Sequence, residues 1–492
     1  MNSEPVRFYT GSAMPSTSLS RNAVASPRTL CSHFDAHRCR SCTLLDIPYA
    51  RQIHSAQQRV ETMLAPVAPR LRWLPPVSSA VTGFRNKAKM VVGGSTNAPV
   101  LGLVDPEGRP VDLTDCPLYP PIIHAVLPLV ASWLRRAQVP PYDVRLRRGD
   151  AKFALVTCSP NDQVMVRIVL RSPKPVPRLR EHLPALLQAA PAIRVVSINI
   201  QPEHKAVLEG PQEIVLTEHS TLPMPLVSAS AAAHTPATVQ PSTAQSLAAA
   251  HTLAAAHSPV LVGTQVSAQT QPEHPTTAIT LHLRPQSFFQ TNTAVAAALY
   301  DQARTWINAL QPATVWDLFC GVGGFAVHAV APGRYVTGVE LSDQAIDSAR
   351  RSFAALRDAH AEMNASMQTT AGAHTSAELN SSAEMDVSAD KTAESLHAQF
   401  IAADALAWAR AQLTHPDLVI VNPPRRGLGE LAHLLESSTA RHVIYSSCNP
   451  ESLARDLAAM PSWRAEEARL LDMFPHTTHG EVIVRLVRPA GS

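Results

Sequence analysis

The sequence predicts an α/β protein whose C-terminal part is a doubly wound, Rossmann-like parallel sheet. Two observations lead to this prediction. Beyond residue 283, short β-rich runs alternate with helical runs, and a glycine-rich turn at 321–324 follows the first of the strands. Strands that alternate with helices build parallel sheets, because the crossover to the next parallel strand is usually helical. The length of 492 residues suggests about three domains.

Hydrophobic periodicity and the turn residues between runs assign the elements of this C-terminal part. The glycine turn should open a helix, since a strand-to-helix turn of this kind lets backbone amides approach a ligand. The elements we expect, in chain order, are a helix at 292–309, a strand at 314–319, a helix at 325–331, a strand at 335–340, a helix at 343–357, a strand at 417–421, a strand at 442–446, a helix at 451–460 and an edge strand at 481–487.

A second α/β pattern precedes the first and predicts a central domain with a core of its own, over 61–226. Its elements also alternate between the strand and helix periods. They are strands at 89–92, 164–170 and 195–200, and helices at 122–136 and 178–190.

Three segments lack the periodicity of folded elements. Residues 1–28 are rich in Ser, Pro, Thr and Asn with few large apolar side chains, which predicts a disordered leader. Residues 227–277 and 359–397 are dominated by small and polar residues, and long insertions of this kind are linkers or disordered loops. We interpret both as insertions without chemistry, the second of which interrupts a C-terminal domain at 278–488.

Positive charge is concentrated in the N-terminal half of the chain. Residues 1–226 carry 26 Lys and Arg against 16 Asp and Glu, a net charge of +10, whereas residues 227–492 carry −7. This asymmetry fits either a solvated basic surface or a polyanion bound by the N-terminal half. No run of about 20 apolar residues suggests a transmembrane helix, and no secretory signal pattern is present. We therefore expect a cytoplasmic protein, away from membranes, that acts as a monomer.

The glycine turn and two downstream features predict a site for an adenosyl cofactor. Glu340 ends the next strand, 19 residues beyond Gly321, where a carboxylate suits the ribose hydroxyls of S-adenosylmethionine or of NAD. The Asn-Pro-Pro motif at 422–424 favours S-adenosylmethionine, because nucleic-acid methyltransferases place substrate and cofactor against it; the alternative is a plain proline turn. Arg425 follows this motif in place of an aromatic residue that could stack on a base, which disfavours methylation of an amino group.

Cys448, in a Ser-Ser-Cys-Asn-Pro run, and Glu481 predict the chemistry. Carbon 5 of uracil cannot attack a sulfonium methyl group until a thiolate adds to carbon 6 and creates an enolate. A helix that begins at 451 would lower the pKa of the Cys448 thiol. After methyl transfer the proton on carbon 5 must leave, and Glu481 is the candidate base. The alternative, a buried structural cysteine, is disfavoured by the complete motif.

Four other cysteines form a candidate metal site. Seven residues separate Cys31 from Cys39, two separate Cys39 from Cys42, and Cys116 lies further along the chain. Four thiolates are enough for a [4Fe–4S] cluster or for a structural zinc ion. The number of ligands alone does not decide between them.

Several motifs together resemble the RNA uracil-C5 methyltransferase family, over residues from about 31 to 487 apart from the two insertions. They are the runs at 283–292, 317–324, 422–427, 447–450 and 472–477. The resemblance implies a methyltransferase that uses S-adenosylmethionine, with Cys448 as nucleophile and Glu481 as base. It also implies ligands for two cofactors: Gln290, Phe319, Glu340 and Asn422 for S-adenosylmethionine, and Cys31, Cys39, Cys42 and Cys116 for a [4Fe–4S] cluster.

The runs at 83–89 and 114–119 resemble the branch of this family that methylates a uridine of 23S ribosomal RNA. That RNA is then the expected partner, and the uridine must be flipped out, since a stacked base cannot reach the thiol. Arg85, Lys87 and Lys89 are expected to bind phosphates. One departure from the family is Gly480, which stands where relatives have a bulkier residue.

Three alternatives remain open on the sequence alone. The target could be a uridine at another site in ribosomal or transfer RNA. An enzyme that methylates an amino group of a nucleic acid would need no thiol at position 448. An iron–sulfur RNA-binding protein with a vestigial methyltransferase domain would bind RNA but not S-adenosylmethionine.

Overall fold

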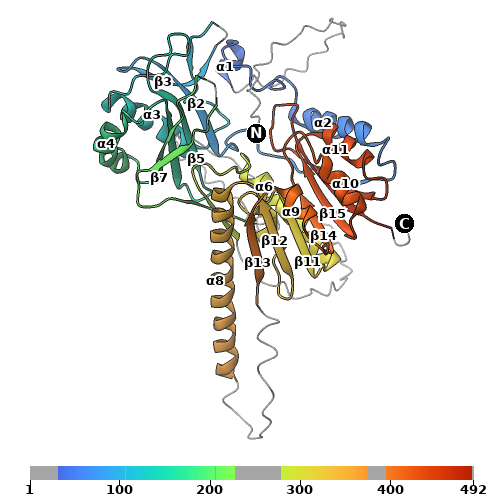
Figure 1. Cartoon of the computed structure of the whole chain (residues 1–492). Coiled ribbons are helices and arrows are strands. Elements are labelled where there is room, and N and C mark those ends of the chain that lie inside the picture. Colours follow the sequence, from blue (N-terminus) through green and yellow to red (C-terminus); the bar gives the residue numbers. More distant parts are fainter. Residues whose placement is uncertain (1–30, 106, 205–206, 228–278, 375–394, 490–492) are drawn as a thin grey trace, which may run out of the picture.

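The computed structural model describes residues 31–489, apart from 106, 205–206, 228–278 and 375–394. The expected leader at 1–28 lies outside the described residues, and so do nearly all of the expected insertion at 227–277 and residues 375–394 of the second one. The described chain forms two lobes, each built on a sheet of its own (Figure 1).

The C-terminal lobe contains an eight-stranded sheet in the order β1-β16-β17-β15-β14-β11-β12-β13. Neighbouring strands from β15 to β13 are parallel, and β17 is antiparallel to both β15 and β16. This topology confirms the expected doubly wound α/β fold. The strands are β1 (Arg72–Trp73), β11 (Thr314–Leu318), β12 (Tyr335–Glu340), β13 (His397–Ala402), β14 (Leu418–Val421), β15 (His442–Ser447), β16 (Arg464–Leu471) and β17 (Glu481–Val487).

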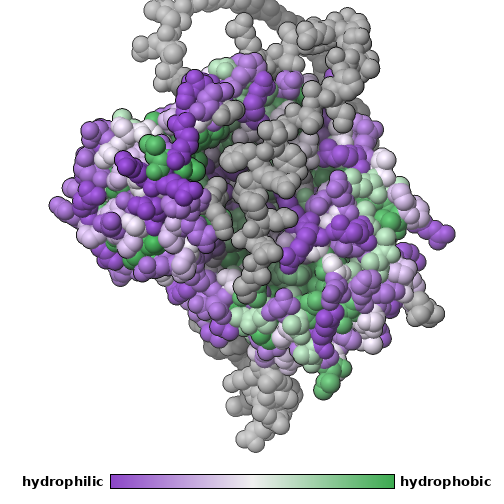
Figure 2. Space-filling view, turned by 45° about the horizontal axis from the view of Figure 1, so that its top comes forward, coloured by the Kyte–Doolittle hydropathy of each residue, from purple (hydrophilic) through white to green (hydrophobic). Residues whose placement is uncertain are grey.

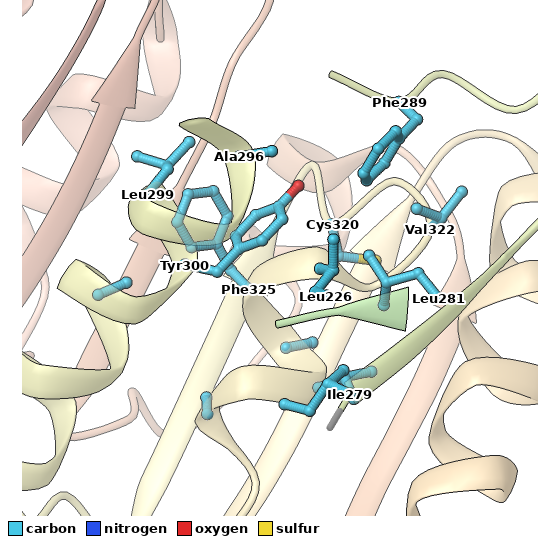
Figure 3. Packing of buried hydrophobic residues seen from close by; sticks show 14 of the residues in the cluster. Leu226, Ile279, Leu281, Phe289, Ala296, Leu299, Tyr300, Cys320, Val322 and Phe325 are labelled. Atoms are coloured by element: carbon cyan, nitrogen blue, oxygen red, sulfur yellow. The ribbon is translucent and has the colours of Figure 1, made fainter. Parts of the chain in front are cut away.

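Helices cover both faces of this sheet, each with a buried apolar core. In the described residues, no helix is long and apolar enough to cross a membrane. On one face, side chains from the helices and from a β9–β10 hairpin pack together (Figure 3). The elements of that layer are α6 (Thr293–Leu310), α7 (Gly324–Ala329), α8 (Asp343–His374), β9 (Leu222–Leu226) and β10 (Ile279–Leu283); the other layer has α2 (Tyr49–Leu64), α9 (Ala405–Arg410), α10 (Glu430–Ser437) and α11 (Pro450–Ala458).

The N-terminal helix α2 and strand β1 belong to this C-terminal lobe. Val60 and Leu64 of α2 are buried in the core that contains α10 and α11, and Arg72 of β1 pairs with Glu467 of β16 in register and by an ion pair. The sequence pattern assigns residues 61–73 to the central domain, whereas these contacts lie in the C-terminal lobe. Local patterns cannot identify such a contact, because the partner strand follows about 390 residues later.

The central lobe contains a seven-stranded sheet in the order β4-β3-β2-β5-β6-β7-β8, antiparallel except for β6 and β7. Helices α3 and α4 pack on it over a continuous apolar core. The elements are β2 (Lys87–Gly94), β3 (Pro99–Val104), β4 (Pro110–Asp112), α3 (Pro121–Arg136), β5 (Ala151–Cys158), β6 (Val164–Leu170), α4 (Val176–Ala189), β7 (Ile193–Ile200) and β8 (Gln212–Val215).

Both expected insertions adjoin regular elements. Helix α8, expected to end at 357, continues to His374 and extends beyond the sheet (Figure 1), so residues 359–374 are helical. Alanine-rich sequence favours helix over coil. Strands β9 and β10 pair from Leu226–Ile279 to Leu222–Leu283, so the chain leaves and re-enters the fold at adjacent positions around residues 228–278.

The burial of α2 yields a stability prediction. Leu64→Ala should lower the free energy of unfolding of the C-terminal lobe by about 2–5 kcal/mol, because it leaves a cavity in a closed core. Leu413, which is fully exposed, provides the control: Leu413→Ala should change it by less than about 0.5 kcal/mol. Urea denaturation measures both. Equal effects would show that α2 does not pack in this core.

Candidate active site

The expected cofactor residues gather where parallel strands end. The glycine turn after β11 is fixed by two hydrogen bonds, from the N–H groups of Phe319 and Cys320 to the Val339 carbonyl oxygen (2.9 and 3.0 Å). Phe319 has a φ of 68°, a conformation that bulky residues rarely adopt. Such strain persists only where the surroundings impose it, and it is commonly found at ligand sites.

Glu340 is tied to the same turn. One of its carboxylate oxygens accepts the Gly321 N–H (3.3 Å), and the other accepts the Ser342 N–H (3.1 Å). A Cβ at Gly321 would meet no atom within 4 Å, whereas a Cβ at Gly324 would lie 2.5 Å from the Tyr300 ring. The first glycine therefore borders open space beside a carboxylate, which suits a nucleoside, and the second permits close helix packing.

Gln290 and Asn422 lie at the ends of neighbouring segments. Gln290 is buried, and its carbonyl oxygen accepts the Asn86 side-chain amide (2.9 Å). The preceding residue, Phe289, packs with Cys320 of the glycine turn (Figure 3). Asn422 is half-buried directly after β14. Phe319, Glu340 and Asn422 thus lie at the carboxyl ends of β11, β12 and β14. The role of these residues and of Gln290 as ligands of S-adenosylmethionine stays a prediction.

Asp317, one residue before the end of β11, is wholly buried. Burial raises the pKa of its carboxyl to about 8. One oxygen accepts the Ala326 N–H (2.8 Å), and the other has no partner among the described residues. The hydrogen bond to Ala326 fixes the start of α7.

The pairing of β15 with β17 brings Cys448 and Glu481 to the same end of the sheet. Ser447 pairs with Val482 in antiparallel register, so Cys448 and Glu481 are the next residues on the two strands. Glu481 is 1% exposed, and its carboxylate accepts the Ser446 hydroxyl at 2.5 Å. Burial raises the Glu481 pKa to about 7, against the opposing effect of the Ser446 hydrogen bond.

Arg425 contacts the thiol of Cys448. The sequence prediction did not include this contact. Burial, followed by the Glu481 charge, raises the pKa of the Cys448 thiol, whereas the charge and side-chain hydrogen bond of Arg425 lower it. The expected helix begins at Pro450, capped by Asn449. The sequence signal for Arg425 is its place directly after the Asn-Pro-Pro motif.

Helix α11 fixes the loop that carries Arg425. The Asn449 side chain donates to the Arg425 carbonyl oxygen (2.9 Å). The buried Asp456 carboxylate accepts both the Leu428 N–H and the Tyr445 hydroxyl at 2.7 Å. The loops after β14 and β15 are therefore held as one unit, which keeps the guanidinium beside the thiol.

A cavity of about 450 Å³ opens beside Cys448. Helix α2 lines one wall with Ala56, Arg59 and Met63, and Arg425 and His479 lie on other walls. None of the four expected ligands of S-adenosylmethionine lines it, so it approaches the thiol from the side of α2. Arg59 and Arg425 contribute positive charge to the lining of this cavity, and Glu451 contributes one negative charge.

The four N-terminal cysteines line a second cavity, of about 570 Å³, between the lobes. Burial and the charges of the other cysteines raise the pKa of Cys42 to about 12, and burial raises that of Cys116 to about 11. In the described part of the chain, no group of three or more His, Cys, Asp or Glu side chains has the arrangement of a site for one metal ion. The cysteines thus surround a shared space and do not converge on a point.

The three expected phosphate-binding residues have different surroundings. Arg85 and Lys89 line the cysteine cavity. Lys87 lies near Arg167, and both burial and that charge lower its pKa. These positions do not form a single basic surface, so their part in RNA binding stays a prediction.

Known proteins resemble this chain over nearly its whole length. A family model described as tRNA (Uracil-5-)-methyltransferase matches residues 400–489. The 23S rRNA (uracil(747)-C(5))-methyltransferase RlmC of Vibrio cholerae serotype O1 is 38% identical over 460 residues, 93% of this chain and 99% of the relative. The protein of the same name from Halothiobacillus neapolitanus is 39% identical over 462 residues, with the same coverage of each chain.

A solved structure supports the fold independently. The Pyrococcus abyssi tRNA (uracil-54, C5)-methyltransferase, solved in complex with S-adenosyl-L-homocysteine, superposes with a TM-score of 0.60. The match covers 91% of this chain and 85% of that one at 19% identity. At this identity the likeness concerns the fold alone.

The contact between Arg425 and Cys448 leads to a prediction on thiol reactivity. Arg425→Gln removes a positive charge that favours the thiolate, so the thiol pKa should rise and alkylation by iodoacetamide at pH 8 should slow about tenfold. Glu481→Gln removes the negative charge and should speed alkylation. Arg426→Gln, one residue further on, is the matched control and should leave the rate unchanged. A pH profile that is identical for Arg425→Gln and the parent would contradict the assignment.

Proposed function

The chain belongs to the RNA uracil-C5 methyltransferase family, and from this premise we propose that it methylates carbon 5 of uridine 747 in 23S ribosomal RNA. The enzyme uses S-adenosylmethionine as its methyl donor. The observation that carries the proposal is the antiparallel register that sets Cys448 and Glu481 side by side at the end of a methyltransferase sheet. The RNA and the uridine follow from the relatives of the same name.

Cys448 begins the reaction by attacking carbon 6 of the uracil. The thiolate forms a carbon–sulfur bond, and the displaced electron pair becomes an enolate that makes carbon 5 nucleophilic. Arg425 supports this step by favouring the thiolate. Gln290, Phe319, Glu340 and Asn422 would hold S-adenosylmethionine, which would supply the methyl group and leave as S-adenosylhomocysteine.

Glu481 completes the reaction by removing the proton from carbon 5. The released electron pair restores the double bond between carbons 5 and 6 and expels the Cys448 thiolate. A base works best when its pKa lies near the working pH, and the value of about 7 for Glu481 meets that condition. Ser446 holds the carboxylate in place through its hydroxyl.

The substrate reaches the thiol as a flipped nucleotide. Unstacking of the base costs a few kcal/mol, least in a loop, and the phosphates on either side must be held. Arg59 and Arg425 supply positive charge along the cavity beside Cys448. In the coloured part of the face in Figure 2, hydrophilic residues predominate and hydrophobic ones lie in patches between them.

We also propose that Cys31, Cys39, Cys42 and Cys116 hold a [4Fe–4S] cluster. The donor set fits, since four thiols line one cavity. Four thiolates suit either a [4Fe–4S] cluster or a zinc ion, and the likeness to the RNA uracil-C5 methyltransferase family favours the cluster.

The first test of function uses a 23S RNA fragment in which 5-fluorouridine replaces uridine. Fluorine on carbon 5 cannot leave as a proton, so the reaction should stop at a covalent adduct that survives a denaturing gel. Cys448→Ala should abolish this adduct, whereas Cys158→Ala, in β5 outside both cavities, is the control and should retain it. Mapping the adduct identifies the target base.

Each other result of this test has a definite meaning. An adduct on transfer RNA but not on the 23S fragment would replace the proposed substrate and keep the chemistry. Methylation that persists in Cys448→Ala would indicate an amino-group methyltransferase. Failure of the enzyme to bind S-adenosylmethionine in calorimetry would indicate a vestigial domain.

The cluster proposal predicts brown protein with four irons per chain after anaerobic purification. Cys39→Ser should lose colour and iron, since thiolate ligands hold such clusters. Cys158→Ala, a cysteine in β5 outside the cavity, is the control and should keep both. Zinc in place of iron in elemental analysis, or full iron content in Cys39→Ser, would refute the assignment.

A further inference from the structure

One loop connects the two cavities. Residues 472–480 join β16 to β17 and end at Glu481. His476 of this loop lines the cavity of the four cysteines, and Thr478, His479 and Gly480 line the cavity beside Cys448. The loop that delivers the proposed base is therefore shared between the cysteine segment and the site of methyl transfer.

Gln52 and His476 join this loop to the N-terminal segment. The His476 N–H donates to the Gln52 side-chain oxygen (3.0 Å), and the His476 carbonyl oxygen accepts the Leu44 N–H (2.9 Å). The Gln52 amide donates in turn to the carbonyl oxygens of Leu44 (2.8 Å) and Ile47 (2.7 Å). Both Gln52 and His476 are buried, so these bonds are shielded from water.

Helix α2 also holds both ends of the loop. At its start, the Tyr49 hydroxyl donates to the Asp472 carboxylate (2.7 Å) and accepts the Ser79 N–H (2.7 Å). Near the end of the loop, the Arg59 guanidinium donates to the Thr478 carbonyl oxygen (2.7 Å). His476 in the middle has a φ of 66°, a conformation that persists for a non-glycine residue only when its surroundings impose it.

We propose that Gln52 and His476 are positioning residues, through which the cysteine segment places Glu481 for proton removal. Leu44, which follows Cys42 by two residues, is hydrogen-bonded to His476 of the loop. An ordered cysteine segment therefore also fixes the position of the loop. Glu481 is the first residue of β17, and the ends of strands fray unless they are tied down. The inference deepens the proposed function, on which it rests, and gives the proposed cluster a mechanical role.

Two assays separate positioning from general damage. Adduct formation on 5-fluorouridine RNA needs thiol addition and methyl transfer but no proton removal. Tritium release from RNA labelled at carbon 5 of uridine needs proton removal as well. A variant that misplaces Glu481 should slow tritium release while adduct formation continues at the rate of the parent protein.

Gln52→Leu should slow tritium release about tenfold, since a displacement of about 1 Å can cost up to about a hundredfold in rate. Adduct formation should change by less than about twofold. Tyr49→Phe removes only the hydroxyl that bonds to Asp472 at the start of the same loop, and it should give a smaller effect in the same direction. Gln58→Leu, exposed on the same helix, is the matched control and should change neither rate.

Removal of iron tests the link to the cysteines. Parent enzyme treated with ferricyanide and EDTA should reproduce the selective loss of tritium release. Equal slowing of both assays in Gln52→Leu and Tyr49→Phe, or normal tritium release after iron removal, would overturn the inference and leave the proposed function standing. Absence of an adduct with the untreated parent enzyme would overturn the proposed function and this inference with it.

Discussion

The antiparallel pairing of β17 with β15 is the constraint on which the proposed active site depends. It sets Val482 opposite Ser447, and so it delivers Glu481 to the strand end that carries Cys448. A shift of the pairing by one residue would turn every side chain of β17 to the other face and would remove Glu481 from the site. Val482 and Val484 belong to the core under α2 and α11, and the intervening Ile483 belongs to the core on the other face, so the shift would require both cores to repack.

Two further contacts position the side chains of Arg425 and Glu481 beside Cys448. Asp456 fastens the loop after β14 to α11, which places Arg425 at the thiol. The Ser446 hydroxyl orients the Glu481 carboxylate and offsets part of the cost of burying it. Neither contact touches the substrate, yet both control the two charges that the reaction needs. Buried polar groups therefore orient the side chains of Arg425 and Glu481, in a place where water would otherwise compete for their hydrogen bonds.

Local sequence predicted the elements whose signals are local. Strand and helix periods located the parallel sheet, and the glycine turn, Asn422 and Cys448 lie at strand ends where motif spacing placed them. Residues that act through distant contacts gave no comparable signal. Helix α2 lines the cavity beside Cys448 from about 390 residues away, and Arg425 meets the thiol only after α11 folds the two loops together. Such contacts depend on tertiary packing, which no window of sequence contains.

The mutual influence of Cys448 and Glu481 orders the chemical steps. An ionised Glu481 raises the pKa of the thiol, so two neighbouring negative charges are disfavoured in this buried place. When the thiolate adds to carbon 6, sulfur becomes a neutral thioether and that repulsion disappears. Glu481 can then carry its negative charge at the stage when the carbon 5 proton must leave. Proton removal returns Glu481 to its neutral form, which makes room for the thiolate that elimination regenerates. The charge of the thiolate itself passes to the uracil enolate and is cancelled when carbon 5 accepts the methyl group of a sulfonium, so Glu481 carries its own charge only after it has released a proton to solvent.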